Sequence, residues 1–233
     1  MALWNSMIYK ERALNMVFKF IAEICNKNEI SKIICDTAKI NYKKFADSKH
    51  ESGPQSDKPI ILRGKNRIAM IAACLYRACE INKNPRTTKE ITLMFEFDNN
   101  DEIYIKQAIK KFNQIIKNCD NHIATPEDYI RARYSKLNIN INIESAIKIC
   151  HDNYKIKPLS DYPVESIAAA SILFIVKRDN ININKQDIVN LFATSISHMQ
   201  QIYNILQNEI YNLNYDSINN IPKFDNKNEI IYV

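Results

Sequence analysis

The chain has 233 residues, of which 46% are hydrophobic, enough to build a packed core in one or two domains. No stretch approaches the roughly 20 unbroken apolar residues of a membrane span, and the N-terminus lacks the basic-then-apolar layout of a signal peptide. Only two glycines occur, Gly53 and Gly64, which excludes the glycine-rich loops that bind phosphate groups. We therefore expect a protein of the cytosol or nucleus without a membrane partner.

Positive charge is concentrated in the first half of the chain. Residues 1–118 contain 21 Lys and Arg against 13 Asp and Glu, whereas residues 119–233 contain 11 against 13. The formal net charge of +6 therefore arises from the first half alone. This asymmetry indicates either a polyanionic partner on that side or an ordinary solvated surface.

Apolar residues recur with a helical period throughout the first half. They predict five helices, at residues 7–25, 31–45, 67–81, 87–95 and 101–117. The segment 46–60 has no apolar period and contains Gly53-Pro54, so it is predicted to be a long exposed loop. Thr87 and Glu90 have the spacing of a capping box at the start of the fourth helix.

The second half begins with another helix start signal. Thr125 is a candidate N-cap and Pro126 suits the first helical position, which places a domain boundary near 119–124. Asn184 with Asp187 repeats the capping pattern, and Ser197 with Gln200 has the spacing of a further capping box. The predicted helices cover residues 127–137, 143–154, 163–178, 185–192 and 197–213, and the tail from residue 214 is expected to be extended.

One helix-turn-helix pattern occurs twice. Residues 64–91 align without a gap to residues 161–188, and both segments carry a run of alanines inside an apolar helix. A repeat of about one hundred residues indicates a duplicated domain, because solenoid units are only about 20–50 residues long. We predict an all-α protein with two tandem five-helix domains, at 1–120 and 121–213, and a C-terminal tail at 214–233. In each domain the alanine-rich helix is expected to be central, since small side chains let neighbouring helices approach closely.

The residues that support catalysis or metal binding show no recognisable arrangement. No two of the six cysteines have the C-x₂-C spacing of a zinc site, and most fall within apolar helical runs. They are predicted to be buried, reduced thiols. The four histidines stand apart, and no Ser or Cys lies in a nucleophile motif. We therefore predict a binding protein with no catalytic residue and no metal site.

Three short motifs carry a resemblance to a known family. AACLYRAC at 72–79, PRTTKEI at 85–91 and IAAASI at 167–172 resemble the tandem repeats of the transcription factor IIB (TFIIB) family, which have the cyclin fold. The resemblance covers about residues 5–213. The heavy use of Asn, Ile and Lys fits a member encoded by a large DNA virus.

The resemblance implies a transcription initiation factor core. Its expected partners are promoter double-stranded DNA, TATA-binding protein and RNA polymerase, and it would act as a monomer in the nucleus, or in a cytoplasmic virus factory if viral. Family members normally begin with a zinc ribbon. The cysteines here do not form one, so the chain is expected to be an excised core or a member without that module, with no cofactor.

The resemblance implies a first DNA contact at the loop entering the third helix. That loop would reach the minor groove downstream of the TATA box, and its expected contact residues are Arg63, Gly64, Lys65, Asn66 and Arg67. The glycine would permit close backbone approach to DNA. Between residues 39 and 67 there are eight Lys and Arg against three Asp and Glu, so the surrounding field is positive. The alternative is a solvated loop with a turn glycine.

A second contact is implied at the helix-turn-helix of the second repeat. Its recognition helix would enter the major groove through Ser197, His198, Gln200 and Gln201. Gln200 aligns with a base-reading arginine of the family, and Gln prefers adenine where Arg prefers guanine. Residues 194–213 contain no Lys or Arg, which removes the phosphate-neutralising charge that such binding normally uses.

One departure from the family pattern and two alternative functions are weighed against the initiation-factor interpretation. The start of the fifth helix has Asn100-Asp101-Glu102 where the family often carries a lysine pair; acids at that point also stabilise a helix N-terminus. The cyclin fold is shared with regulatory subunits of protein kinases, which is the alternative function. A decoy that binds TATA-binding protein without recruiting polymerase is a third hypothesis.

Overall fold

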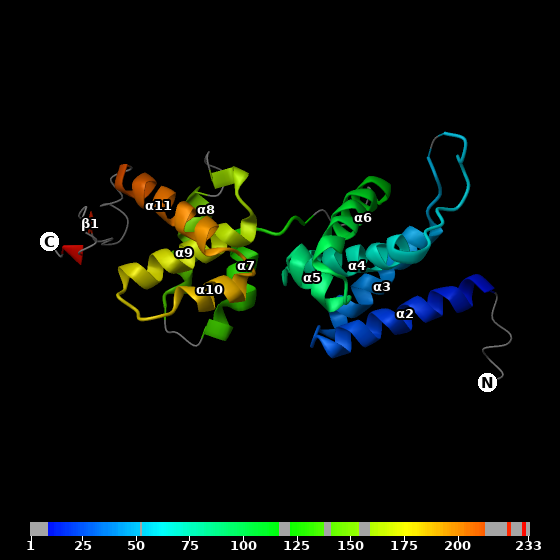
Figure 1. The fold of residues 1–233 in the computed structure, drawn as a ribbon, viewed down its shortest axis with the longest axis horizontal. Coiled ribbons are helices and arrows are strands. Elements are labelled where there is room, and N and C mark those ends of the chain that lie inside the picture. The colour runs from blue at the N-terminus through cyan, green and yellow to red at the C-terminus, as the bar shows by residue number, and fades with distance from the viewer. Residues whose placement is uncertain are drawn as a thin grey trace. The chain divides into compact units, whose positions relative to one another are not determined.

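The computed structural model describes residues 9–51, 53–116, 122–137, 141–153 and 159–212, together with the short segments 223–224 and 230–231. The chain divides into two compact units, residues 1–123 and 124–233 (Figure 1). The described residues form ten α-helices, five in each unit, so the all-α prediction is confirmed. At the C-terminal end, Lys223–Phe224 and Ile230–Ile231 pair as two-residue antiparallel strands.

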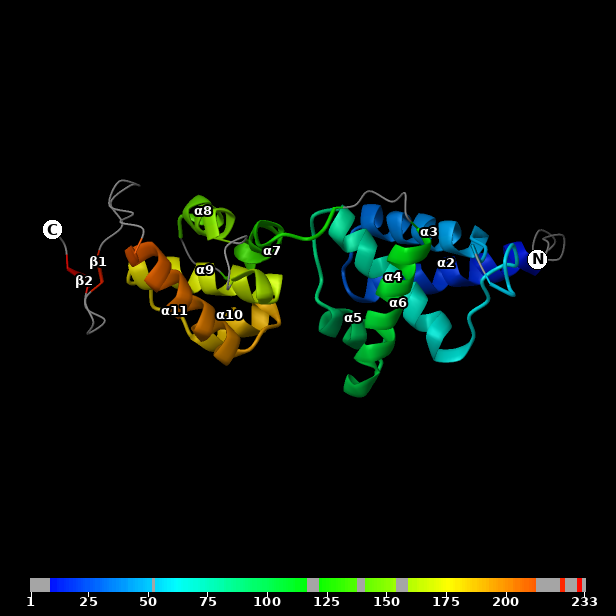
Figure 2. The ribbon, with the colours of Figure 1, turned by 90° about the horizontal axis from the view of Figure 1, so that it is seen from above.

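The first unit is built around its alanine-rich helix. α4 packs against both α3 and α6, and α2 lies along α3 (Figures 1 and 2). Ala69, Ala72 and Ala73 of α4 are fully buried. Their small side chains let the flanking helices approach α4 closely. The central placement predicted for this helix is confirmed. The helices of the unit are α2 (Tyr9–Lys27), α3 (Lys32–Asp47), α4 (Gly64–Ile81), α5 (Thr88–Met94) and α6 (Glu102–Ile115), with a 3-10 turn η1 (Asn99–Asp101) before α6.

The connection between α3 and α4 has more order than the loop predicted at 46–60. Isolated bridges join Lys49 to Pro59 and His50 to Ser56, and the His50 amide donates to the Lys58 carbonyl at 3.0 Å. The segment therefore folds back on itself and projects from the unit as a hairpin-like excursion, drawn in cyan in Figure 1. Local backbone hydrogen bonds supply this order without any apolar period in the sequence.

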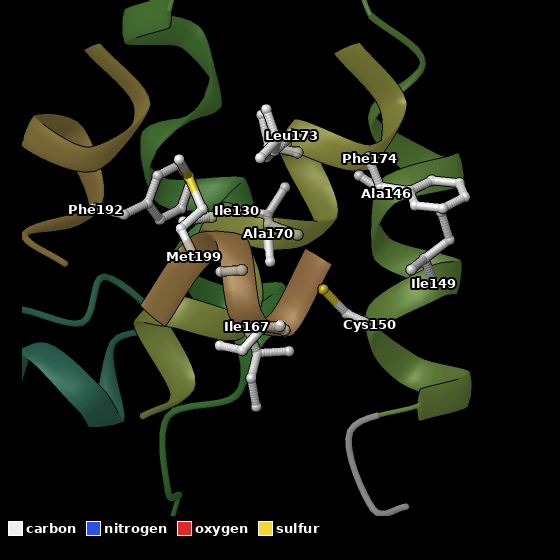
Figure 3. Close-up of a cluster of buried hydrophobic side chains, with 14 of the residues drawn as sticks. Ile130, Ala146, Ile149, Cys150, Ile167, Ala170, Leu173, Phe174, Phe192 and Met199 are labelled. Carbon is white, nitrogen blue, oxygen red and sulfur yellow. The ribbon is translucent and has the colours of Figure 1, made fainter. Parts of the chain in front are cut away.

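The second unit repeats the plan around α9. This helix contacts all four other helices of its unit, and Ala168, Ala169 and Ala170 are fully buried. In Figure 3 the side chains of Ile130, Cys150, Phe192 and Met199 converge on α9 from the other four helices. The elements are α7 (Pro126–Arg133), η2 (Tyr134–Leu137), α8 (Ile143–Asn153), η3 (Leu159–Asp161), α9 (Val164–Arg178), α10 (Lys185–Phe192) and α11 (Ile196–Asn212).

Two of the predicted helix caps are confirmed in full. The Thr87 hydroxyl accepts from the Glu90 amide, and the Glu90 carboxylate accepts from the Thr87 amide. Thr125 and Asp128 form the same reciprocal pair, with Pro126 at the first helical position. Each pair satisfies donors that the first turn of a helix leaves open. Asn184 caps α10 by accepting from the Gln186 amide at 2.9 Å.

The cap predicted at Ser197 and Gln200 is wrong. The hydroxyl of Ser195 accepts from the His198 amide at 3.1 Å, and its carbonyl accepts from Met199 at 3.0 Å. α11 therefore begins at Ile196, before the predicted start. Ser195 can cap because it follows the turn directly, whereas Ser197 already lies inside the helix.

The cysteines of the described segments behave as predicted from their apolar surroundings. Cys25, Cys35, Cys74, Cys79 and Cys150 are free and buried. Burial raises the pKa of the Cys79 and Cys150 thiols to about 12, because the charged thiolate loses its solvation. Cys119 and most of the predicted tail from residue 214 lie outside the described residues.

Candidate nucleic-acid interface

The first candidate surface is the N-terminal turn of α4. Arg63 has an extended backbone (φ −131°, ψ 160°), and the helix begins at Gly64 with a φ of +52°. The side chains of residues 63–68 are all exposed. The predicted loop is thus corrected: Gly64 to Arg67 are already the first turn of the helix, which directs their side chains outward from a rigid element.

Gly64 is favoured by its backbone conformation. Its positive φ lies in the left-handed region that side-chain-bearing residues adopt only at a cost. A Cβ built at Gly64 meets no atom within 4 Å, so no part of the protein crowds this position. The open space around it leaves the backbone accessible to a ligand from outside.

Lys65 is held by an ion pair inside the first unit. Its Nζ lies 2.8 Å from Oδ2 and 3.1 Å from Oδ1 of Asp101, and 5.9 Å from the centre of the Tyr104 ring. The Asp101 carboxylate is 11% exposed, whereas the Lys65 side chain is 58% exposed. The hydrogen bond to Asp101 raises the pKa of the Lys65 ammonium group. Lys65 therefore meets any external anion in competition with Asp101.

Arg63 and Arg67 differ from Lys65 in this respect. Within the described residues, no carboxylate forms an ion pair with either guanidinium group, and both side chains are exposed. Asn66 lies between them on the same exposed turn. The end of α4 thus presents two unneutralised guanidinium groups beside a neutralised ammonium group, an arrangement suited to phosphate oxygens.

The acids at the start of α6 have structural partners. Asp101 accepts from Lys65, while Glu102 accepts from the Thr88 hydroxyl at 2.5 Å and from Lys106 at 2.9 Å. These contacts tie α6 to the starts of α4 and α5. The lysine pair expected from the family is therefore replaced by acids that hold the unit together.

The second candidate surface is the helix-turn-helix of α10 and α11. The turn passes through Ala193, whose φ of +52° ends α10. Arg133 is 4% exposed and donates to the Leu191 carbonyl at the end of α10. Its guanidinium carbon lies 4.9 Å from the centre of the Tyr129 ring and 5.9 Å from that of Phe192. This buried cation fixes the end of α10, and hence the direction in which the turn delivers α11.

α11 has one buried stripe and one exposed face. Met199, Ile202, Tyr203 and Leu206 are buried against the core of the unit. Ser197, His198 and Gln201 are exposed, as the recognition-helix interpretation requires, and Gln200 is half-buried. The His198 ring packs edge-on against Tyr162, with centroids 6.3 Å apart. The four predicted site residues therefore lie together on the first two turns of a well-anchored helix.

Sequence reasoning missed a lysine at this surface. Lys185, the first residue of α10, donates from its Nζ to Oε1 of Gln200 at 2.8 Å. Gln200 in turn donates from Nε2 to Oδ1 of Asn204 at 3.0 Å. Although residues 194–213 carry no Lys or Arg, α10 brings a positive charge onto the exposed edge of α11. The only signal in the sequence was the position of Lys185 at the start of the helix that packs on α11.

The two candidate surfaces belong to different units, and each is made of residues from its own unit. Across the described parts of the chain, no group of three or more His, Cys, Asp and Glu side chains could hold a metal ion. No helix among those residues is long and apolar enough to cross a membrane.

Comparison with known proteins places these features in a family. Residues 10–112 match the family described as Transcription factor TFIIB repeat. A transcription initiation factor IIB-like protein of Acanthamoeba polyphaga mimivirus is 45% identical over 209 residues, which cover 86% of this chain and 45% of that protein. Transcription initiation factor IIB of Encephalitozoon cuniculi is 27% identical over 231 residues, covering 94% of this chain and 68% of that protein.

A plant relative agrees with these two. Transcription initiation factor IIB of Oryza sativa is 29% identical over 173 residues, covering 72% of this chain and 51% of the plant protein. The chain thus spans about half the length of the mimivirus and rice relatives. The matches extend through both units, and the two five-helix units agree with a tandem-repeat core. The chain belongs to the TFIIB family.

Proposed function

We propose that this chain is the core of a transcription initiation factor that binds promoter double-stranded DNA together with TATA-binding protein and helps recruit RNA polymerase. The observation that carries the proposal is the pair of exposed, rigidly held surfaces at the start of α4 and on α11, in a chain of the TFIIB family. The proposed DNA contacts are Arg63, Gly64, Lys65, Asn66 and Arg67 in the first unit and Ser197, His198, Gln200 and Gln201 in the second.

The first unit would supply electrostatic affinity. Arg63 and Arg67 are exposed on one helical turn, and the whole first half of the chain carries a positive excess. Guanidinium groups neutralise phosphates and release condensed counterions, which gives affinity that falls steeply with salt. Such contacts position a protein on DNA without reading its sequence. The minor groove downstream of the TATA element is the proposed location.

The second unit would supply contact with the base edges upstream. An α-helix delivered by a helix-turn-helix fits the width of the major groove. Apart from Ile196, the exposed side chains among residues 196–208 of α11 are polar, which suits hydrogen bonding to bases. We propose a monomer that needs no cofactor in these two units and acts in the nucleus, or in a cytoplasmic virus factory if its source is viral.

A gel-shift with TATA-containing duplex DNA tests the proposal. The full chain is titrated with and without TATA-binding protein across a salt series. We expect a supershift that requires both proteins. The logarithm of the binding constant is expected to fall linearly with the logarithm of the salt concentration. Absence of a shift under every condition would overturn the proposal and favour the kinase-regulator alternative, which co-purification with an activated kinase would then identify.

A further inference from the structure

A chain of three polar side chains crosses from α10 to the exposed face of α11. Lys185 Nζ donates to Gln200 Oε1 at 2.8 Å, and Gln200 Nε2 donates to Asn204 Oδ1 at 3.0 Å. Gln200 and Asn204 are one helical turn apart, so their side chains are neighbours on the same face of α11. Lys185 and Gln200 are half-buried, and Asn204 is exposed.

The lysine decides which way both amides point. An ammonium group can only donate, so Lys185 must face the oxygen of the Gln200 amide and not its nitrogen. The Gln200 nitrogen is therefore directed toward Asn204, whose amide oxygen accepts the hydrogen bond. The Asn204 nitrogen then lies on the far side of its amide. A single donor-only group thus fixes two amides that could otherwise flip.

Gln200 retains one donor and one acceptor, and Asn204 retains two donors and one acceptor. Every amide nitrogen has two hydrogens and every amide oxygen has two acceptor sites, and the relay uses only part of them. Adenine presents one acceptor (N7) and one donor (the N6 amino group) in the major groove, which is complementary to such an amide. Guanine presents two acceptors there, N7 and O6, and would meet the amide oxygen unfavourably.

No lysine or arginine of α11 itself lies beside the relay. Residues 196–208 contain no Lys, Arg, Asp or Glu, and the exposed positions around the relay are Ser197, His198, Gln201 and Asn208. Arginine, the side chain that most often reads guanine, is therefore absent from this part of the helix. Gln201 is an additional amide beside the relay.

We propose that Lys185 acts as a positioning residue that orients Gln200 and Asn204, and that α11 thereby reads adenine in the major groove. This inference rests on the proposed function, since it specifies the base preference of the same DNA surface. It assigns a role in base recognition to Asn204 and a role in orientation to Lys185.

Competition binding with duplexes that differ only beside the TATA element tests the relay. The full chain and TATA-binding protein are bound to duplexes whose upstream flank is either A·T or G·C at each position in turn. We expect a preference of about tenfold for A·T at one or more positions, the discrimination of one bidentate amide–adenine pair. The variant Asn204→Ala is expected to remove most of that preference.

Variants of the lysine separate orientation from charge. Lys185→Ala is expected to reduce the A·T preference toward unity, and Lys185→Arg to retain it, because arginine is also a donor-only group. Lys177→Ala, which removes the same charge from the exposed end of α9, is the matched control and is expected to leave the preference unchanged. Circular dichroism confirms that each variant is folded.

The outcomes distinguish this inference from the proposed function. Binding with equal affinity for A·T and G·C flanks, or a preference for G·C, would overturn the relay and leave promoter binding intact. Retention of the full preference in Lys185→Ala would overturn the positioning role. Failure to bind any duplex would overturn the proposed function itself, and the relay with it.

Discussion

The two units share one arrangement of helices but present opposite chemistry to a ligand. In the first unit, the exposed turn at the start of α4 carries Arg63 and Arg67. In the second, the exposed face of α11 carries the amides of Gln201, Asn204 and Asn208 with Ser197 and His198, and α10 adds one lysine. Charged groups suit the uniform phosphate backbone, and uncharged hydrogen-bonding groups suit base edges. On the proposed function, the duplication would separate affinity from specificity while keeping the same core.

The shared part of the two units is the packing around the central helix. α4 and α9 each bury a run of alanines against the flanking helices. The residues that differ in function lie at helix starts and on exposed faces, where substitution leaves the core unchanged. The two units therefore differ at their surfaces, and variants of each unit test that difference.

Removal of a core ring should have the largest effect and should be confined to one unit. Phe174 is fully buried in α9 and lies 6.0 Å from the Tyr203 ring of α11. Phe174→Ala is expected to lower the free energy of unfolding of the second unit by about 3–5 kcal/mol, from lost burial and the cavity left behind. Hydrogen exchange measured by mass spectrometry should show lost protection in residues 124–212.

The matched variant lies in the first unit. Phe112 of α6 is 1% exposed, and Phe112→Ala is expected to expose the amides of the first unit while sparing those of the second. Equal loss of protection in both units from either variant would show that the two units unfold as one.

Charge reversal at α4 should have the next largest effect. Arg67→Glu is expected to weaken DNA binding about tenfold at low salt and to flatten the salt dependence by about one unit of slope, the contribution of one phosphate contact. The control is Lys83→Glu, at the opposite end of α4, which should change affinity by less than about twofold. Equal effects of the two variants would indicate a non-specific field instead of a contact.

Loss of the carboxylate that pairs with Lys65 should raise DNA affinity, by less than charge reversal at Arg67 lowers it. Asp101→Asn removes the carboxylate that neutralises Lys65, so DNA affinity is expected to rise about threefold and the salt dependence to steepen. Fluorescence anisotropy across a salt series measures both quantities. A fall in affinity would show that Asp101 orients Lys65 for DNA instead of competing with it.

The reactivity of the buried thiols measures the stability of each unit separately, without any substitution in the protein. Cys79 in the first unit and Cys150 in the second are buried, and burial raises the pKa of each to about 12. Labelling by a thiol reagent at pH 8 is therefore expected only when a unit opens. Because the unfolded thiols ionise near pH 9, stability is expected to fall as the pH rises from 9 toward 12. Rapid labelling of the native protein at pH 8 would contradict this assignment.

The fold could be predicted from the sequence wherever the interacting groups are close along the chain. The caps at Thr87 and Thr125 each join residues three positions apart, and the alanine runs mark the central helices directly. The cap at Ser197 was wrong because Ser195, which has no Glu or Gln three positions later, lies directly before the helix and accepts from the His198 amide.

The candidate surfaces could be predicted less well, because their key contacts join residues that are distant in the sequence. Lys65 pairs with Asp101, and Lys185 with Gln200, across 36 and 15 positions respectively. Neither spacing corresponds to a local motif, so the sequence indicated which residues are exposed but not which of them are neutralised or oriented. The DNA contacts themselves stay predictions.

The buried stripe of α11 has a consequence for how the protein can evolve. Met199, Ile202, Tyr203 and Leu206 anchor the helix, and none of the positions between them that face outward contributes to the core. Lineages can therefore exchange the outward side chains freely while the scaffold persists. On the proposed function, a few substitutions at these outward positions would change which promoter bases the protein contacts and would leave the fold intact.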